Sequence, residues 1–250
     1  MQRITLIPRG MVFPVVTTLD SKVLPEYNER IKSFNEKARE SLDIFSDKKG
    51  ILIGSNCFAP LVLREFLPKD LRLATMYDLE KLGRENPDFL RGFYIETGLV
   101  LRTPGDSYKE NDLLAKNLAE QLKHKGITLE NPKIIYFDAL DLEENKDSAY
   151  GLVYKLNERA NLGKNIIDAS ELTNDFMFKT INEKGIPVKD ENGNRNLYTR
   201  EDGLSRFVLD RDSDVLSYDR YLADSDDDGQ VVVIENKQSL EKKSQERGSQ

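Results

Sequence analysis

The sequence predicts a mixed α+β fold, in which the N-terminal part alternates strands and helices and the C-terminal part is mainly antiparallel β-sheet. Three observations lead to this prediction. Short runs rich in β-branched and aromatic residues recur along the chain. Apolar residues at three- and four-residue steps mark two long helices. After residue 151, turn-forming pairs become frequent, as expected for strands joined by tight turns.

The N-terminal part contains alternating strand and helix signals. One helix is expected to end near residue 45. A second helix is expected to stop at Gly126, and Leu114, Leu118 and Leu122 line one of its faces. The expected strands are residues 4–7, 12–17, 50–54, 94–101 and 133–137. One expected helix ends near residue 45, and the others cover residues 58–66, 76–82 and 111–125.

The C-terminal part is expected to contain strands at residues 197–200, 207–209 and 231–234. The pair Asn192-Gly193 predicts a β-hairpin, because its two residues accept the positive φ angles of a tight turn.

For the domain organisation, we expect an α/β-like layer part at residues 1–147 and a β-rich part at 148–235. One continuous domain fits equally well. The polar residues 236–250 are expected to form a disordered tail.

The charge of the chain is concentrated in one stretch. Ten acidic and three basic residues lie between positions 201 and 230, so this stretch alone accounts for the net charge of −7. No basic patch is visible in the linear sequence, so nucleic-acid binding is not expected, although folding can assemble such a patch. With one cysteine and no long apolar run, we expect a cytoplasmic protein without a membrane span.

The sharpest motif is an acidic loop that matches a calcium-binding pattern at every specified position. Asp224, Asp226 and Asp228 would supply carboxylates, Gln230 a backbone carbonyl, and Glu235 a closing carboxylate for a Ca²⁺ ion. The β-branched residues that follow Gln230 favour a strand over the helix of an EF-hand. An acidic turn that leads into a strand therefore stands as the alternative.

Two other candidate sites are weaker. Asp138 and Asp141 follow an apolar strand, where magnesium-binding acids occur in phosphate-transferring enzymes, but the chain has no phosphate-binding G-x-x-x-x-G-K-[ST] loop. Cys57 follows a polar turn before a helix, and its only possible histidine base, His124, lies at the end of another helix. A small buried apolar role is the simpler interpretation of Cys57.

Aromatic residues alternate with Arg91 and Arg102 in one further stretch. They are explained more simply by core packing around the strand at residues 94–101 than by a binding surface. These aromatic residues are Phe89, Phe93, Tyr94 and Tyr108.

The sequence favours an intracellular binding or interaction protein with a protein partner and no catalytic role. The chain has one histidine, one cysteine, no tryptophan and no complete catalytic motif. Two alternatives remain open: a metal-dependent enzyme acting on a phosphate-containing substrate, and a calcium-stabilised β module. The sequence does not indicate an oligomeric state.

Overall fold

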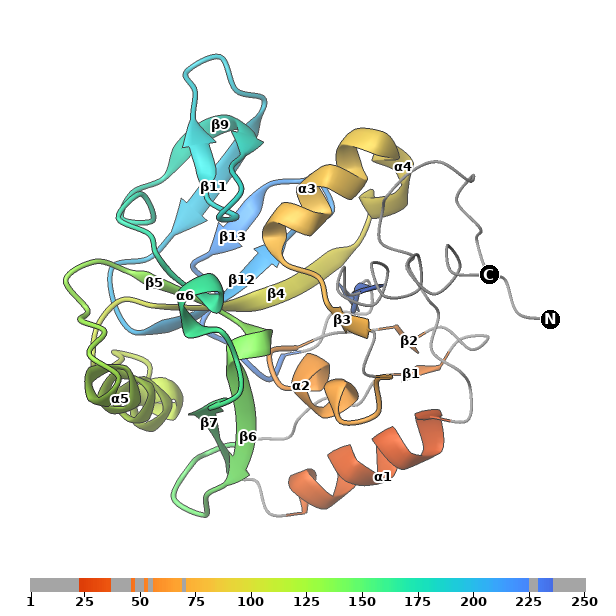
Figure 1. Cartoon of the computed structure of the whole chain (residues 1–250), viewed down its shortest axis with the longest axis vertical. Coiled ribbons are helices and arrows are strands. Elements are labelled where there is room, and N and C mark those ends of the chain that lie inside the picture. The colour runs from red at the N-terminus through yellow and green to blue at the C-terminus, as the bar shows by residue number, and fades with distance from the viewer. Residues whose placement is uncertain are drawn as a thin grey trace, which may run out of the picture.

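The computed structural model describes residues 23–36, 46–47, 52–53, 56–68, 71–224 and 229–235. The strands expected at residues 4–7 and 12–17 lie outside these ranges. The same holds for the end of the first helix near residue 45 and for the tail at 236–250. Within the described residues the protein is a mixed α+β fold, as predicted, and it has mostly strands and few helices (Figure 1).

The helices are short, apart from α1 and α5. They are α1 (Val23–Asn35), α2 (Ala59–Arg64), α3 (Met76–Glu85), α4 (Pro87–Leu90), α5 (Lys109–His124), α6 (Leu162–Asn165) and the 3₁₀ helix η1 (Phe137–Ala139). The prediction for residues 111–125 is confirmed as α5, and the one for residues 76–82 is confirmed as α3. None of the helices in the described ranges has the length and apolar character needed to cross a membrane.

The strands are more numerous than the sequence predicts. They are β1 (Ser46–Asp47), β2 (Leu52–Ile53), β3 (Leu71–Leu73), β4 (Tyr94–Leu101), β5 (Lys133–Tyr136), β6 (Leu140–Glu144), β7 (Leu152–Leu156), β8 (Ile166–Asp168), β9 (Phe176–Ile181), β10 (Pro187–Lys189), β11 (Arg195–Thr199), β12 (Leu204–Leu209), β13 (Val215–Ser217), β14 (Gly229–Gln230) and β15 (Val233–Glu235). The prediction for residues 94–101 is confirmed with the same bounds as β4.

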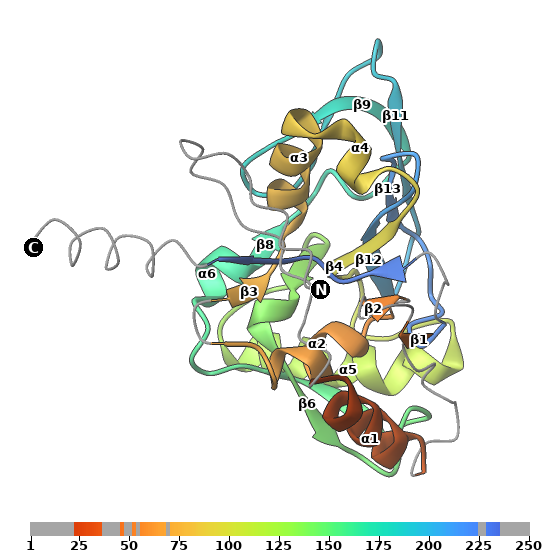
Figure 2. The ribbon, with the colours of Figure 1, turned by 90° about the vertical axis from the view of Figure 1, so that its right-hand side faces the viewer.

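One large sheet, curled into a half-barrel, organises the fold (Figures 1 and 2). Its strand order is β10-β9-β11-β13-β12-β4-β5-β8, and β14 pairs in parallel with the start of β4. Three smaller two-stranded pairs, β1-β2, β15-β3 and β6-β7, make up the other β structure of the described residues. Strands from both sides of residue 147 therefore pair within the same sheet.

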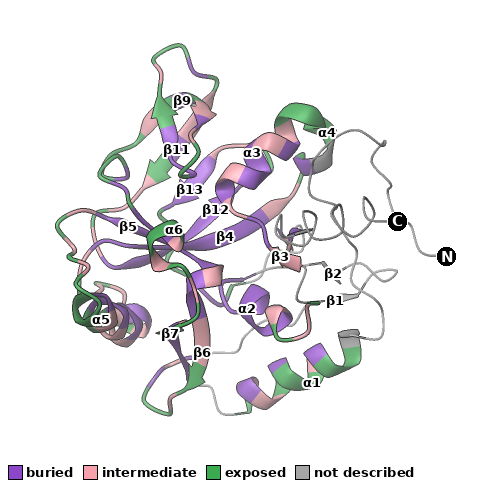
Figure 3. Ribbon diagram, in the orientation of Figure 1, coloured by how far each residue is buried: buried purple, intermediate pink, exposed green. Residues whose placement is uncertain are grey.

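Strand β4 is buried on both faces, and this divides the interior into two cores. Leu99 and Leu101 pack into one apolar cluster, while Ile95 and Val100 pack into the other. Because neighbouring side chains of a strand point to opposite faces, a strand with both faces covered buries nearly all of its residues. This explains why seven of the eight residues of β4 are buried (Figure 3).

The two cores are covered by different helices. Helix α5 packs against β7 and β12 through Leu114, Leu118 and Leu122, which are fully buried. Helix α3 packs against β9 and β12 and, with α4, lies on the other side of the sheet (Figure 1). The leucine spacing seen in the sequence therefore corresponds to the buried face of α5.

Helix α3 begins at a well-defined N-cap. The Thr75 hydroxyl accepts a hydrogen bond from the Asp78 backbone N–H, and the Asp78 carboxylate accepts one from the Thr75 backbone N–H, which together form a capping box. Arg72 adds two hydrogen bonds to Asp78, at 2.8 and 3.1 Å. Burial raises the pKa of Asp78, but the bonds from Arg72 and Thr75 outweigh burial and leave it below its ordinary value.

The hairpin predicted at Asn192-Gly193 is wrong. The turn joins β10 to β11, but both of these strands pair with β9, which lies between them. The true hairpin is β9-β10, at the turn that contains Gly185 with φ +81°. A local turn signal does not specify which strands become neighbours, because pairing depends on the whole sheet.

We predict that Gly98→Ala lowers the free energy of unfolding by roughly 1–3 kcal/mol. A methyl group at this position of β4 would lie 2.5 Å from the Ile135 carbonyl oxygen of β5, so the two central strands would have to separate. Gly163→Ala is the control, because its nearest atom lies at 3.6 Å. Urea unfolding of both variants measures the difference, and equal stabilities would contradict the prediction.

Candidate functional site

The acidic loop at residues 224–235 is only partly described. Asp226 and Asp228 lie outside the described residues, as does the side chain of Glu235. Asp224 is exposed, Gln230 lies in β14, and Glu235 ends β15 opposite Leu71. The described part therefore continues as strands, as the β-branched residues indicate, while cation binding by the loop stays a prediction.

The acids after β5 do not converge into a metal site. Asp138 lies in η1, and burial raises its pKa, although Arg72 and Arg64 oppose that rise. Asp141 lies in β6, where its carboxylate accepts a hydrogen bond from Arg64. The same guanidinium donates to the Phe137 carbonyl at 2.7 Å. Within the described ranges, no group of three or more His, Cys, Asp or Glu side chains is placed to hold a metal ion.

Cys57 belongs to a buried polar cluster. Its thiol lies 3.5 Å from Glu96 Oε2, and Arg206 donates to Glu96 and, at 3.0 Å, to Asp219. Burial and the Glu96 carboxylate raise the pKa of Cys57, so the thiol stays protonated. His124 is exposed in the last turn of α5. Because the thiolate is the reactive form of cysteine, this environment favours a structural role.

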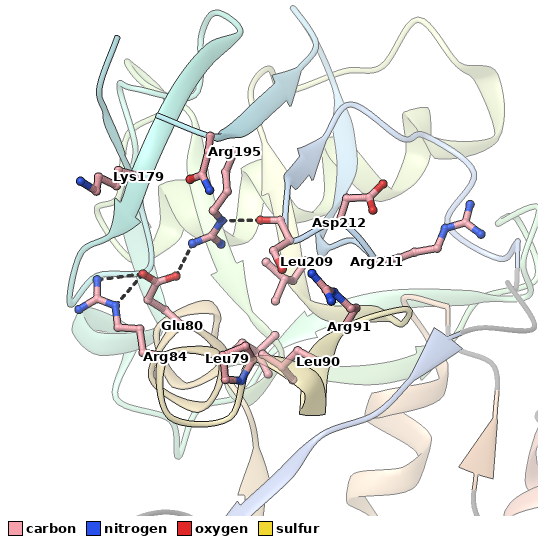
Figure 4. A pocket seen from close by; sticks show the side chains of 14 residues that line it. Leu79, Glu80, Arg84, Leu90, Arg91, Lys179, Arg195, Leu209, Arg211 and Asp212 are labelled. Carbon is pink, nitrogen blue, oxygen red and sulfur yellow. Dashed lines mark hydrogen bonds and ion pairs between the residues drawn. The ribbon is translucent and has the colours of Figure 1, made fainter. Parts of the chain in front are cut away.

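A pocket with a strongly basic lining lies between α3–α4 and the sheet (Figure 4). It has a volume of about 420 Å³ and is lined by five basic and two acidic side chains. The basic side chains are Arg84, Arg91, Lys179, Arg195 and Arg211. The acidic ones are Glu80 and Asp212. The lining therefore has a formal excess of three positive charges, in a chain whose net charge is −7.

These five cations come from five separate segments. Arg84 lies on α3, Arg91 follows α4, Lys179 lies on β9, Arg195 begins β11, and Arg211 lies in the turn between β12 and β13. The sheet order brings these segments together, because β9 and β11 are neighbours and α3 packs on β9. Among these five, only Arg91 belongs to a stretch with a possible binding pattern in the sequence, and core packing was the expected explanation of that stretch.

Arg195 is the most firmly held of these cations. Its Nη1 donates to Glu80 at 2.6 Å, its Nε donates to the Ser213 carbonyl at 2.6 Å, and its guanidinium carbon lies 4.5 Å from the centre of the Phe178 ring. The other Glu80 oxygen accepts from Arg84 at 3.0 Å. The Glu80 side chain is only 5% exposed, so this buried carboxylate fixes two guanidiniums at once.

A strained turn lines the pocket next to Arg195. Ser213, between β12 and β13, has φ +68° and is the only residue other than glycine with a positive φ in the described ranges. The Asp210 carboxylate stabilises this turn by accepting hydrogen bonds from the backbone N–H groups of Asp212 and Asp214. Left-handed backbone at a non-glycine residue is costly and is often found at binding sites.

Two of the cations are available to a ligand. Lys179 and Arg91 are exposed, and neither has a hydrogen bond or ion pair with any residue of the described ranges. Arg211 lies 5.3 Å from the centre of the Tyr94 ring. A concave surface with excess positive charge attracts anions, and its effect exceeds that of the same charges on a flat surface.

Searches of protein-family models, of curated proteins and of solved structures find no match to this chain.

We predict that Cys57 resists thiol-modifying reagents in the native protein. Its side chain is fully buried and burial raises its pKa, so modification requires unfolding. Labelling with a chromogenic disulfide reagent should be slow in buffer and complete in denaturant. Rapid labelling of the native protein would contradict the buried placement.

We predict that Arg206→Met destabilises the fold more at pH 8 than at pH 5. Burial raises the pKa of Glu96, and Arg206 opposes part of that rise, so the variant should raise it further. A carboxyl group with a raised folded pKa stabilises the fold below its unfolded pKa, and this contribution is lost as pH rises through the folded pKa. The deficit above that pKa should be about 3–5 kcal/mol.

The measurement is urea unfolding of wild type and variant at both pH values. Lys155→Gln is the control, because it breaks an exposed ion pair with Glu143 and should give no comparable change between pH 5 and pH 8. A deficit in Arg206→Met that is the same at both pH values would show that Glu96 is not the cause.

Proposed function

We propose that this protein is an intracellular binding protein whose ligand is anionic and occupies the basic pocket. The single observation that supports this proposal is the gathering of five cationic side chains, from five separate segments, around one pocket of about 420 Å³. The whole chain is acidic, so a random distribution of its charged side chains would favour acidic surfaces. The concentration of positive charge around this pocket therefore supports a site for anions.

The size of the pocket favours a small organic anion. Small-molecule sites in proteins typically have volumes of about 300–1,000 Å³. A long polyanion such as nucleic acid fits less well, because it needs an extended basic surface and would meet the acidic remainder of the chain. The same basic pocket also suits a protein partner that binds through an acidic or phosphorylated side chain.

The two alternatives from the sequence also stay proposals. A metal-dependent enzyme acting on a phosphate-containing substrate would use the same basic pocket for its substrate, but it needs a metal site in addition. A calcium-stabilised β module depends on the loop at residues 224–235. The cytoplasmic location rests on the single cysteine of the sequence, whose buried thiol requires no oxidising compartment.

The test is titration calorimetry with inorganic pyrophosphate at low ionic strength. We expect binding that weakens as salt is added, because salt screens exposed charges. Lys179→Gln and Arg91→Gln should each weaken binding about fivefold, because a partly exposed charge pair contributes about 1 kcal/mol.

The matched controls are Lys123→Gln and Arg159→Gln. Each removes one positive charge at an exposed position that does not line the pocket. If both controls weaken pyrophosphate binding as much as the pocket variants do, the effect comes from net charge and the proposed site is wrong. If pyrophosphate and other phosphate-containing anions give no heat and no thermal stabilisation, the proposed function is wrong.

A further inference from the structure

The cations of the basic pocket form two groups. In Figure 4, Lys179, Arg84 and Arg195 lie on one side of the view and Arg91 and Arg211 on the other, where the side chain of Arg211 extends away from Arg91. Each group contains one exposed cation without a bonded partner in the described ranges, Lys179 in the first and Arg91 in the second. The two groups therefore offer two separate attachment points for negative charge.

Each group also has its own acid. Glu80 is bonded to both arginines of the first group, so that group has a formal excess of two positive charges. Asp212 lies on the same side as Arg91 and Arg211 in Figure 4, which leaves that side a formal excess of one. The first group should therefore hold the more highly charged end of a ligand, because attraction scales with the net local charge.

The rest of the pocket lining is neutral. Gly83, Pro87 and the buried Leu79, Leu90 and Leu209 contribute to the lining. The pocket volume of about 420 Å³ corresponds to roughly a dozen water molecules at ~30 Å³ each. A single phosphate ion would leave most of this space to water and would contact only one cationic group.

We infer that the ligand of the pocket carries two phosphate-like anionic groups separated by a neutral spacer. This inference rests on the proposed function and specifies its ligand class. One anionic group lies on the side of Lys179, Arg84 and Arg195, and the other lies against Arg91. Two linked groups bind more tightly than one, because the second attaches without a further loss of translational freedom once its spacer matches the span.

The test uses alkane-α,ω-bisphosphonates of increasing chain length, beginning with methylenebisphosphonate. Monophosphonates of the same chain length are the controls for apolar contact. Calorimetry at fixed ionic strength should show affinity rising to an optimum spacer length and then falling. At the optimum, the bisphosphonate should bind about tenfold more tightly than methylenebisphosphonate, since it gains the second group of cations.

Two variants test the two ends of the ligand separately. Arg91→Gln and Lys179→Gln should each reduce the advantage of the optimum bisphosphonate over its monophosphonate, while Lys123→Gln should leave that advantage unchanged. If methylenebisphosphonate binds as tightly as every longer homologue, the pocket has one compact anion site, and this inference is overturned while the proposed function stands. If no phosphonate and no pyrophosphate binds, both are overturned.

Discussion

The burial of strand β4 on both of its faces is the constraint on which the remaining structure depends. A strand in this position must have apolar neighbours above and below it, so other elements must cover both sides of the sheet. Helix α5 covers one side, and α3 with α4 covers the other (Figure 1). The close approach of β4 and β5 at Gly98 adds a steric condition that no larger residue meets without displacement.

The same arrangement produces the pocket. Helix α3 must lie against β9 to cover the second core, and this places Glu80 and Arg84 next to Arg195 on β11. The ion pairs therefore follow from the packing of apolar residues. They add a fixed geometry, because each oxygen of the Glu80 carboxylate accepts from a different arginine. A guanidinium held in this way loses little conformational entropy when a ligand binds.

Charge is used differently in the two polar regions of the protein. In the core, Arg206 donates hydrogen bonds to Glu96 and Asp219. Because these groups lie in the protein interior, removing one of the charges leaves the others uncompensated. At the pocket, positive charge exceeds negative charge, and Lys179 and Arg91 face solvent. Compensated charge stabilises a structure, whereas uncompensated charge in a concave surface is suited to a ligand of opposite sign.

The sequence by itself determined the local elements of this protein. The apolar spacing of Leu114, Leu118 and Leu122 predicted α5, because such spacing reflects which face becomes buried. Residues 94–101, rich in β-branched and aromatic residues, predicted β4. The mixed α+β class follows from these elements.

Only the tertiary structure decided the strand order and the candidate site. Asn192-Gly193 indicated a turn, but the position of β9 between β10 and β11 depends on contacts across the whole sheet. Likewise, Arg84 and Arg211 are far apart along the chain, and no local pattern relates them. Their convergence depends on how α3 and the β12–β13 turn pack on the sheet, because non-local contacts, and not residue spacing, place distant charges around one pocket.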